Sequence, residues 1–252
     1  MPSERDGAAP APAQHPRSVP RTARERARAE ITSEILSAGR RYLATEGAAG
    51  LSLRAIARDL GMASSAVYRY VASRDDLLTK LIIDAYDSLG DAAETRESTV
   101  PRADLISRWA AVCTAVRDWA HANPNEYALV YGSPVPGYVA PLDTIGPASR
   151  VSNLLVQILV HAASGQHQAT PPVADGAPVA WRSALEPVRA AIPAQVPPEV
   201  IQVGLMVWSA LFGVVSFELF GQFHNVVGEN PGDREAFFAE CIRRWAMQLG
   251  LC

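Results

Sequence analysis

From residue 22 onward, the apolar residues of this chain recur at intervals of three and four, the spacing of one face of an α-helix. The first such stripe covers residues 22–47 and ends at Gly47, a residue type favoured just after a helix C-terminus. Two short patterns follow at 53–60 and 64–70, and a longer one begins at Ser73. No stretch alternates convincingly as a β-strand would. The pattern therefore predicts an all-α protein.

Helical stripes resume after Pro101. They predict helices near 105–123, 125–131, 143–163, 181–192, 198–223 and 234–249, with a loop at 164–179. Residues 1–20 are rich in Pro and Ala and carry no pattern, which predicts a disordered tail. We therefore expect a three-helix domain with a helix-turn-helix at residues 21–90 and a larger helical bundle at residues 100–252.

Residues 51–71 have the offsets that two crossing helices require. Ala57 is small where the second helix would cross the first, Gly61 tolerates the positive φ of the turn, and Val67 supplies the inward apolar contact. A helix-turn-helix of this kind places its second helix in the major groove of DNA. The spacing by itself also occurs in proteins that do not bind DNA.

The outer side of this helix pair carries hydroxyl and guanidinium groups, which reach base edges and phosphates. The predicted DNA contacts are Ser52, Ser64, Ser65, Tyr68, Arg69 and Arg74. Ser52 and Arg74 are included among the predicted contacts because they stand at helix starts, where backbone N–H groups also favour binding of a phosphate. Upstream arginines could follow the DNA backbone or the minor groove: Arg21, Arg24, Arg26 and Arg28.

Charge separates the two parts of the chain. Residues 1–80 carry 13 Arg and Lys against 9 Asp and Glu, a net +4, whereas residues 81–252 carry 10 against 17, a net −7. A basic head on an acidic body suits a polyanion-binding module joined to a domain that stays away from the polyanion. Double-stranded DNA is therefore the partner that we expect for the head.

Composition excludes several classes of protein. With 48% hydrophobic residues the chain can form a real core, and the longest apolar run, Met206–Val215, is shorter than the ~18 residues of a membrane helix. We expect no membrane partner, and the absence of a signal-like segment and the three scattered cysteines favour the cytoplasm. No catalytic or metal-binding motif is present in the sequence. No enzyme, cofactor or metal is predicted.

Two features of the second half suggest further partners. Aromatic residues on several predicted helices could line a pocket for a small effector, although each could equally be ordinary core: Trp109, Tyr127, Tyr131, Trp208 and Phe212. The helix at 203–223 is apolar nearly all round and must be covered on more than one face. Together with the last helix it predicts a homodimer interface at Leu205, Trp208, Phe212, Val215, Phe237, Ile242 and Trp245. A central helix of a monomeric bundle is the alternative.

Residues 25–80 resemble the N-terminal domain of the TetR/AcrR family of transcriptional regulators. The resemblance is carried by Gly47 and Gly50, Ser52-Leu53, Ile56-Ala57, Gly61, Tyr68 and the run from Ser73 to Leu78. Ala63 departs from the pattern by standing where a capping Ser or Thr is usual, so Ser64 is a candidate cap. The second half resembles a C-terminal domain of the Trp-His-Gly type, through Trp119, Asn123-Pro124, Tyr127 and the run from Trp208 to Glu218, with Phe212 in the place of the His.

These resemblances imply a homodimeric DNA-binding transcriptional regulator. We expect a repressor that leaves its operator when a small apolar effector binds the second domain. One alternative is an activator or architectural protein that binds DNA without a ligand. The other is an all-α enzyme or binding protein in which the helix-turn-helix is incidental.

Overall fold

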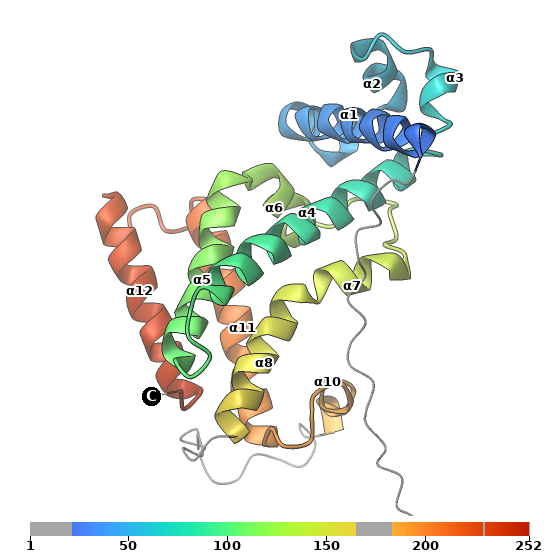
Figure 1. Ribbon diagram of the computed structural model, residues 1–252. Coiled ribbons are helices and arrows are strands. Elements are labelled where there is room, and N and C mark those ends of the chain that lie inside the picture. Colours follow the sequence, from blue (N-terminus) through green and yellow to red (C-terminus); the bar gives the residue numbers. More distant parts are fainter. Residues whose placement is uncertain (1–21, 165–182, 229, 252) are drawn as a thin grey trace, which may run out of the picture.

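The computed structural model describes residues 22–164, 183–228 and 230–251. Every regular element in these ranges is helical, so the prediction of an all-α protein is confirmed for the described residues. Figure 1 shows a small head formed by α1, α2 and α3, a long helix α4 that leaves it, and a larger body of helices below. The predicted tail at 1–20 and residues 165–179 of the predicted loop lie outside the described residues.

The head consists of α1 (Ala23–Glu46), the 3-10 turn η1 (Ala48–Gly50), α2 (Leu53–Asp59) and α3 (Ser64–Val67). Thr22 begins α1 with a complete capping box: its hydroxyl accepts from the Glu25 N–H, and the Glu25 carboxylate accepts from the Thr22 N–H. The head has its own apolar core, which includes Ile35, Ile56, Val67, Leu77 and Leu78.

Helix α4 (Arg74–Ser98) joins head and body without interruption. Ser73 caps it by accepting from the Asp76 N–H at 3.0 Å, while the Asp76 carboxylate accepts from the N–H of Ala72, one residue before the cap. The first turns of α4 bury Leu77, Leu78 and Leu81 in the head core, and the later turns bury Ala85, Leu89 and Ala93 in the body core. One continuous helix therefore belongs to both cores.

The body adds eight more described elements, which are listed by their bounds: α5 (Leu105–Ala122), α6 (Pro124–Tyr131), η2 (Leu142–Thr144), α7 (Ile145–Ala148), α8 (Arg150–Ser164), α10 (Glu186–Ala191), α11 (Pro198–Leu219) and α12 (Pro231–Gln248). The single helix expected at 143–163 is divided into η2, α7 and α8, and the Ser149 hydroxyl bonds back to the Ile145 carbonyl at the break. In the helix expected at 181–192, residues 183–184 are helical and Leu185 is in a turn. The helix α10 then begins at Glu186, with Pro187 in its first turn, where proline is tolerated.

A buried ion pair ties three helices of the body together. Arg108 of α5 is fully buried, and its Nε donates to the Glu97 carboxylate of α4 at 2.6 Å. The Nη1 of the same guanidinium lies 2.8 Å from Nδ1 of His161 on α8. Because a charge in a core is tolerated only when it is paired, these residues fix how α4, α5 and α8 meet.

Helix α11 is the one helix among the described residues with the length and apolar composition that a membrane span would need. Its inner side, which includes Val207, Leu211 and Val215, is buried in the body core. Its other side leaves Met206, Phe217 and Phe220 exposed. Exposed apolar side chains gathered on one side of a helix are typical of a surface that binds a partner.

Candidate DNA-binding surface and junction pocket

The helix-turn-helix has the internal contacts that its sequence predicts. Gly61 adopts φ +63° in the turn, and the Met62 N–H donates to the Ala57 carbonyl at 2.8 Å, which closes the end of α2. Ala57 and Val67 are fully buried where α2 and α3 cross. The turn therefore holds α3 across α2 with one side of α3 free.

The free side of α3 carries the four residues predicted to contact bases and phosphates. Ser64 and Ser65 are exposed in its only full turn, and Tyr68 and Arg69 follow, with Tyr68 48% exposed. Ala63 occupies the N-cap position with extended backbone and supplies no side-chain bond, so Ser64 is the first helical residue and not the cap. Two hydroxyls, a phenol and a guanidinium thus share one exposed turn.

The two residues predicted at helix starts differ in their surroundings. Ser52 is exposed and caps α2, its hydroxyl accepting from the Ala55 N–H at 3.4 Å. Arg74 is half-buried: its Nη2 donates to the Ala48 carbonyl at 2.7 Å and its Nη1 lies 3.6 Å from the Asp75 carboxylate. Arg74 already holds η1 against α4, which leaves it less available for a phosphate than the sequence indicates.

Arg28 has a role that its position in the sequence does not indicate. Its Nη2 donates to the Arg69 carbonyl at 3.1 Å, and its guanidinium lies over the Tyr70 ring at 5.4 Å. Both contacts fasten the end of α3 to α1. Arg28 therefore helps to position the exposed turn. Like Arg24 and Arg26 it is exposed, so a contact with the DNA backbone stays a prediction for all three, and Arg21 lies outside the described residues.

The structure brings together four of the five aromatic residues predicted to bind an effector. The ring centroids of Tyr127 and Tyr131 are 5.0 Å apart, those of Tyr131 and Phe212 are 4.3 Å apart, and Trp208 lies 5.5 Å from Phe212. The Tyr127 hydroxyl lies 2.8 Å from the Ser216 hydroxyl and donates to the Phe212 carbonyl at 3.1 Å. Trp109 is not in this chain of rings.

Apart from the exposed Trp208, these aromatic residues belong to the packed core of the body or pack against it. Tyr127 is fully buried and Phe212 nearly so, and burial raises the pKa of both Tyr127 and Tyr131 above the ordinary value. Trp109 is also buried, and its indole N–H donates to the Ile242 carbonyl of α12. The Tyr127 hydroxyl and the Trp109 indole N–H thus both have partners within the protein, as a core requires.

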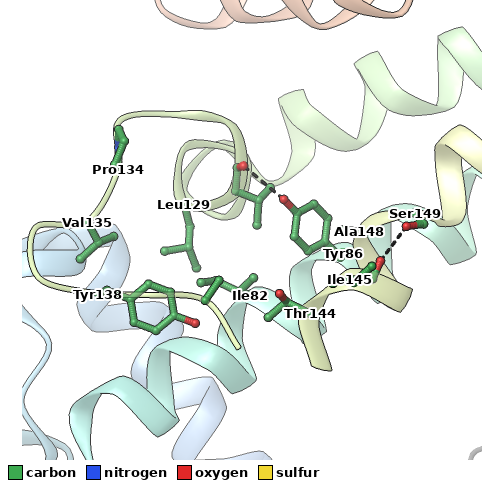
Figure 2. A pocket seen from close by; sticks show the side chains of 12 residues that line it. Ile82, Tyr86, Leu129, Pro134, Val135, Tyr138, Thr144, Ile145, Ala148 and Ser149 are labelled. Atoms are coloured by element: carbon green, nitrogen blue, oxygen red, sulfur yellow. Dashed lines mark hydrogen bonds between the residues drawn. The ribbon is translucent and has the colours of Figure 1, made fainter. Parts of the chain in front are cut away.

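A pocket of about 420 Å³ lies beside this cluster, where head and body meet. Figure 2 shows its walls: Ile82 and Tyr86 come from α4, Leu129 from α6, and most of the others from the segment between α6 and α7 and from α7 itself. The residues that line it are Ile82, Tyr86, Leu129, Val130, Pro134, Val135, Tyr138, Ala140, Thr144, Ile145, Ala148 and Ser149. None of the five predicted effector residues is among them, although the Tyr131 ring contacts Tyr86 edge-on at 6.0 Å.

This pocket adjoins the core of the head. Leu129, Val135 and Tyr138 line it and also pack against the head core. The hydroxyls of Tyr138 and Thr79, a residue of α4, lie 2.9 Å apart. The wall formed by residues 132–141 therefore rests on the domain that carries α3. The sequence gives little sign of this pocket, because turn residues without periodicity build much of it.

The residues predicted to join two copies fall into two groups. Phe212, Val215, Ile242 and Trp245 are buried within this chain's own core. Trp208 and Phe237 are exposed and Leu205 is half-buried. Only the second group is accessible to another chain in this conformation.

Two family profiles match this chain. The profile of bacterial regulatory proteins of the tetR family matches residues 35–81, and that of the Tetracyclin repressor-like C-terminal domain matches residues 109–245. The second match does not specify the Trp-His-Gly type, which stays a prediction.

Full-length relatives cover both parts of the chain. The HTH-type transcriptional regulator Rv1816 of Mycobacterium tuberculosis is 44% identical over 215 residues, which are 83% of this chain and 89% of that protein. Mb1846 of Mycobacterium bovis, also an HTH-type transcriptional regulator, matches to the same extent.

Solved structures share the arrangement of the helices. The crystal structure of the regulatory protein SCO4313 has a TM-score of 0.72 at 34% identity and covers 89% of this chain and 98% of that one. The fatty acid degradation regulator FadR from Bacillus halodurans has a TM-score of 0.54 at 13% identity, covering 85% and 93%, and is similar in fold alone.

Proposed function

The chain belongs to the TetR family of DNA-binding transcriptional regulators, and from this premise we propose that it is a homodimeric repressor which leaves its operator when a small apolar effector binds the body. The family consists of regulators and not of enzymes, so the enzyme alternative is set aside. Bacterial DNA lies in the cytoplasm, and that is the compartment in which we propose that the protein acts.

The exposed turn of α3 is the observation that carries the DNA-binding part of the proposal. Ser64, Ser65, Tyr68 and Arg69 point away from the head core, while Arg28 and the buried Val67 hold this turn in place. A short recognition helix with hydroxyl and guanidinium groups can bond base edges in the major groove and phosphates beside it. Ser52 and the first N–H groups of α2 are proposed to hold a further phosphate.

The free side of α11 supports a two-fold dimer. Met206, Ala210, Gly213, Phe217 and Phe220 recur at intervals of four and three, which places them on one stripe of the helix. The large residues of this stripe are exposed, and the small ones between them permit close approach of a second helix. Phe237 and Met247 extend an exposed apolar surface onto α12.

A dimer also suits the DNA. One recognition helix buries little surface, and two half-sites about 34–36 Å apart require two helices related by two-fold symmetry. We propose that α11 and α12 of two copies form a four-helix interface, which would use the apolar stripe of α11 and, from the predicted set, Phe237. Leu205 and Trp208 lie on another side of α11 than this stripe.

Release of the operator is proposed as a shift between two forms of the dimer. In one form the recognition helices match the spacing of the half-sites, and in the other they do not. An effector that binds more tightly to the second form lowers the affinity for DNA, at most by the ratio of its own affinities for the two forms. A coupling free energy of about 1–3 kcal/mol corresponds to a change of roughly 5–150-fold.

A footprint on the DNA that flanks the protein's own gene tests this function. We expect protection of a two-fold symmetric site, with an affinity that falls steeply as salt rises. Repeating the footprint with uncharged apolar compounds tests release. Protection without release by any compound would favour the alternative of a ligand-independent activator or architectural protein, and absence of protection would contradict operator binding at this locus.

A further inference from the structure

We propose that the junction pocket between α4, α6 and residues 132–149 is the effector site and that its ligand is an uncharged, largely apolar molecule. This inference rests on the regulator function proposed above and gives it a location and a ligand class. It departs from the sequence-based expectation, which places the effector among Trp109, Tyr127, Tyr131, Trp208 and Phe212.

The lining determines the ligand class. None of the twelve lining residues carries a charge, and a volume of about 420 Å³ suits a small organic molecule. The lining hydroxyls already have partners: Tyr86 donates to the Val130 carbonyl, Thr144 to the Pro141 carbonyl and Ser149 to the Ile145 carbonyl. A charged ligand would find no counter-charge among the lining residues, whereas an uncharged apolar ligand would gain contact with their apolar side chains.

The same segment leaves apolar side chains exposed to solvent. Val139 is 86% exposed, Leu142 80% and Ile145 58%, and Ile145 also lines the pocket. Large apolar side chains that are clustered at the surface mark places where a ligand or a partner binds. Here they adjoin a pocket of similar character, so an apolar molecule would meet continuous apolar surface as it enters.

The two walls of the pocket are held to α4 with unequal strength. On the side of Ala148 and Ser149, the neighbouring Arg150 donates to the carboxylates of Asp91 and Glu94 at 2.6 Å and to the carbonyl of Asp87 at 2.8 Å. Residues 132–141 have one hydroxyl contact with α4, between Tyr138 and Thr79, and otherwise apolar packing. A ligand is therefore expected to displace the wall at 132–141, which rests on the head.

Binding of Nile red, an uncharged apolar dye, to the full-length protein without DNA tests the site. We expect a rise in fluorescence with wild type, and at least a tenfold loss of dye affinity in Ile145→Glu, which places a charge in the lining at an exposed position. Ile106→Glu makes the same change at an exposed position of α5 outside the lining and should bind as wild type does. Equal dye affinity of the three proteins would overturn the assignment.

A second variant fills the pocket without adding a charge. Ala148→Trp should weaken dye binding at least tenfold, whereas Ala122→Trp, at an exposed position of α5, should not. Circular dichroism and the unfolding temperature establish that each variant is folded. An altered oligomeric state in Ala148→Trp with unchanged dye binding would mean that a second copy covers this surface, and would contradict the proposal.

The ligand class is tested by competition between matched compounds. 1-Naphthalenemethanol should displace the dye, and 1-naphthoate, with the same rings and a negative charge, should bind at least tenfold more weakly. A preference for the anion would overturn the proposed class. Because these measurements contain no DNA, a failure of operator release would contradict the repressor function while leaving the site assignment standing.

Discussion

At the scale of single residues, the exposed turn of α3 gives the most direct test of DNA recognition. Arg69→Ala should weaken binding to all DNA sequences and reduce the salt dependence by about one phosphate contact, because a guanidinium beside the backbone neutralises one phosphate. Tyr68→Ala should weaken binding by roughly tenfold if its hydroxyl bonds a phosphate. Fluorescence anisotropy with labelled operator at several salt concentrations measures both.

Arg189→Ala is the control for these substitutions. Arg189 is exposed on α10 in the body, so its loss removes the same charge away from the recognition helix. Equal losses of affinity in Arg69→Ala and Arg189→Ala would show that only net charge matters and would contradict the contact assignment.

Gly61 tests the turn itself. Its φ of +63° is the left-handed region, and a Cβ there would meet no atom within 4 Å, so any cost comes from the backbone conformation. Gly61→Ala should lower the free energy of unfolding by about 1–2 kcal/mol. Gly232→Ala in α12 also meets no atom, but stands at ordinary helical φ and should be neutral or slightly stabilising. Urea unfolding compares the two, and equal changes would contradict the backbone explanation.

At the scale of elements, the contact between Tyr138 and Thr79 is the polar link by which residues 132–141 hold α4. Tyr138→Phe removes that link, whose free energy is typically about 0.5–1.5 kcal/mol, or roughly 2–12-fold in an equilibrium. We expect weaker operator binding by a factor in this range and tighter binding of Nile red, because the displaced wall becomes easier to populate.

Tyr42→Phe serves as the comparison for Tyr138→Phe. The Tyr42 hydroxyl donates to the Ala55 carbonyl within the head and makes no link to the body. The Tyr42→Phe variant should therefore bind the dye as wild type does. In Tyr138→Phe, the affinity for DNA should fall while the affinity for the dye rises, and a loss of both affinities would argue against the coupling.

How far the elements could be predicted depends on what determines each of them. Apolar periodicity and turn chemistry are local, and they place α1, α2, α5 and α6 close to their observed ends. The helices α3 and α11 begin where expected but end earlier, at Val67 and Leu219. Periodicity does not reveal which neighbour covers an apolar face. In α12, for example, Ile242 and Trp245 are buried in the body whereas Phe237 is exposed, and the spacing of these residues does not predict this difference.

The candidate sites show the same limit. The exposure of Tyr68 and Arg69 follows from the offsets around Gly61 and could be predicted. The carbonyl contacts of Arg28 and Arg74 join positions 41 and 26 residues apart, and no local pattern encodes them. The junction pocket is built by turn residues, where the spacing of apolar positions carries no information.

At the scale of the whole molecule, the free stripe of α11 predicts the assembly. Met206 is 65% exposed at its centre, so Met206→Glu should leave the fold of one copy intact and place two like charges against each other in a two-fold pair. We expect sedimentation to show a dimer for wild type and a shift toward monomer for Met206→Glu at micromolar concentration, with weaker operator binding. Ile106→Glu controls for surface charge. A monomeric wild type would remove the dimer from the proposed function.

The continuity of α4 has a mechanical consequence. Its 25 residues make a rod of about 37 Å at ~1.5 Å per residue, rooted in the body at one end and in the head at the other. A tilt of only ~5° at the end that packs in the body would move the end in the head by about 3 Å. This is close to the ~3.4 Å that separates successive bases along a strand. A helix of this length would thus turn a small tilt in the body into a shift of the recognition helix by about one base step along the duplex.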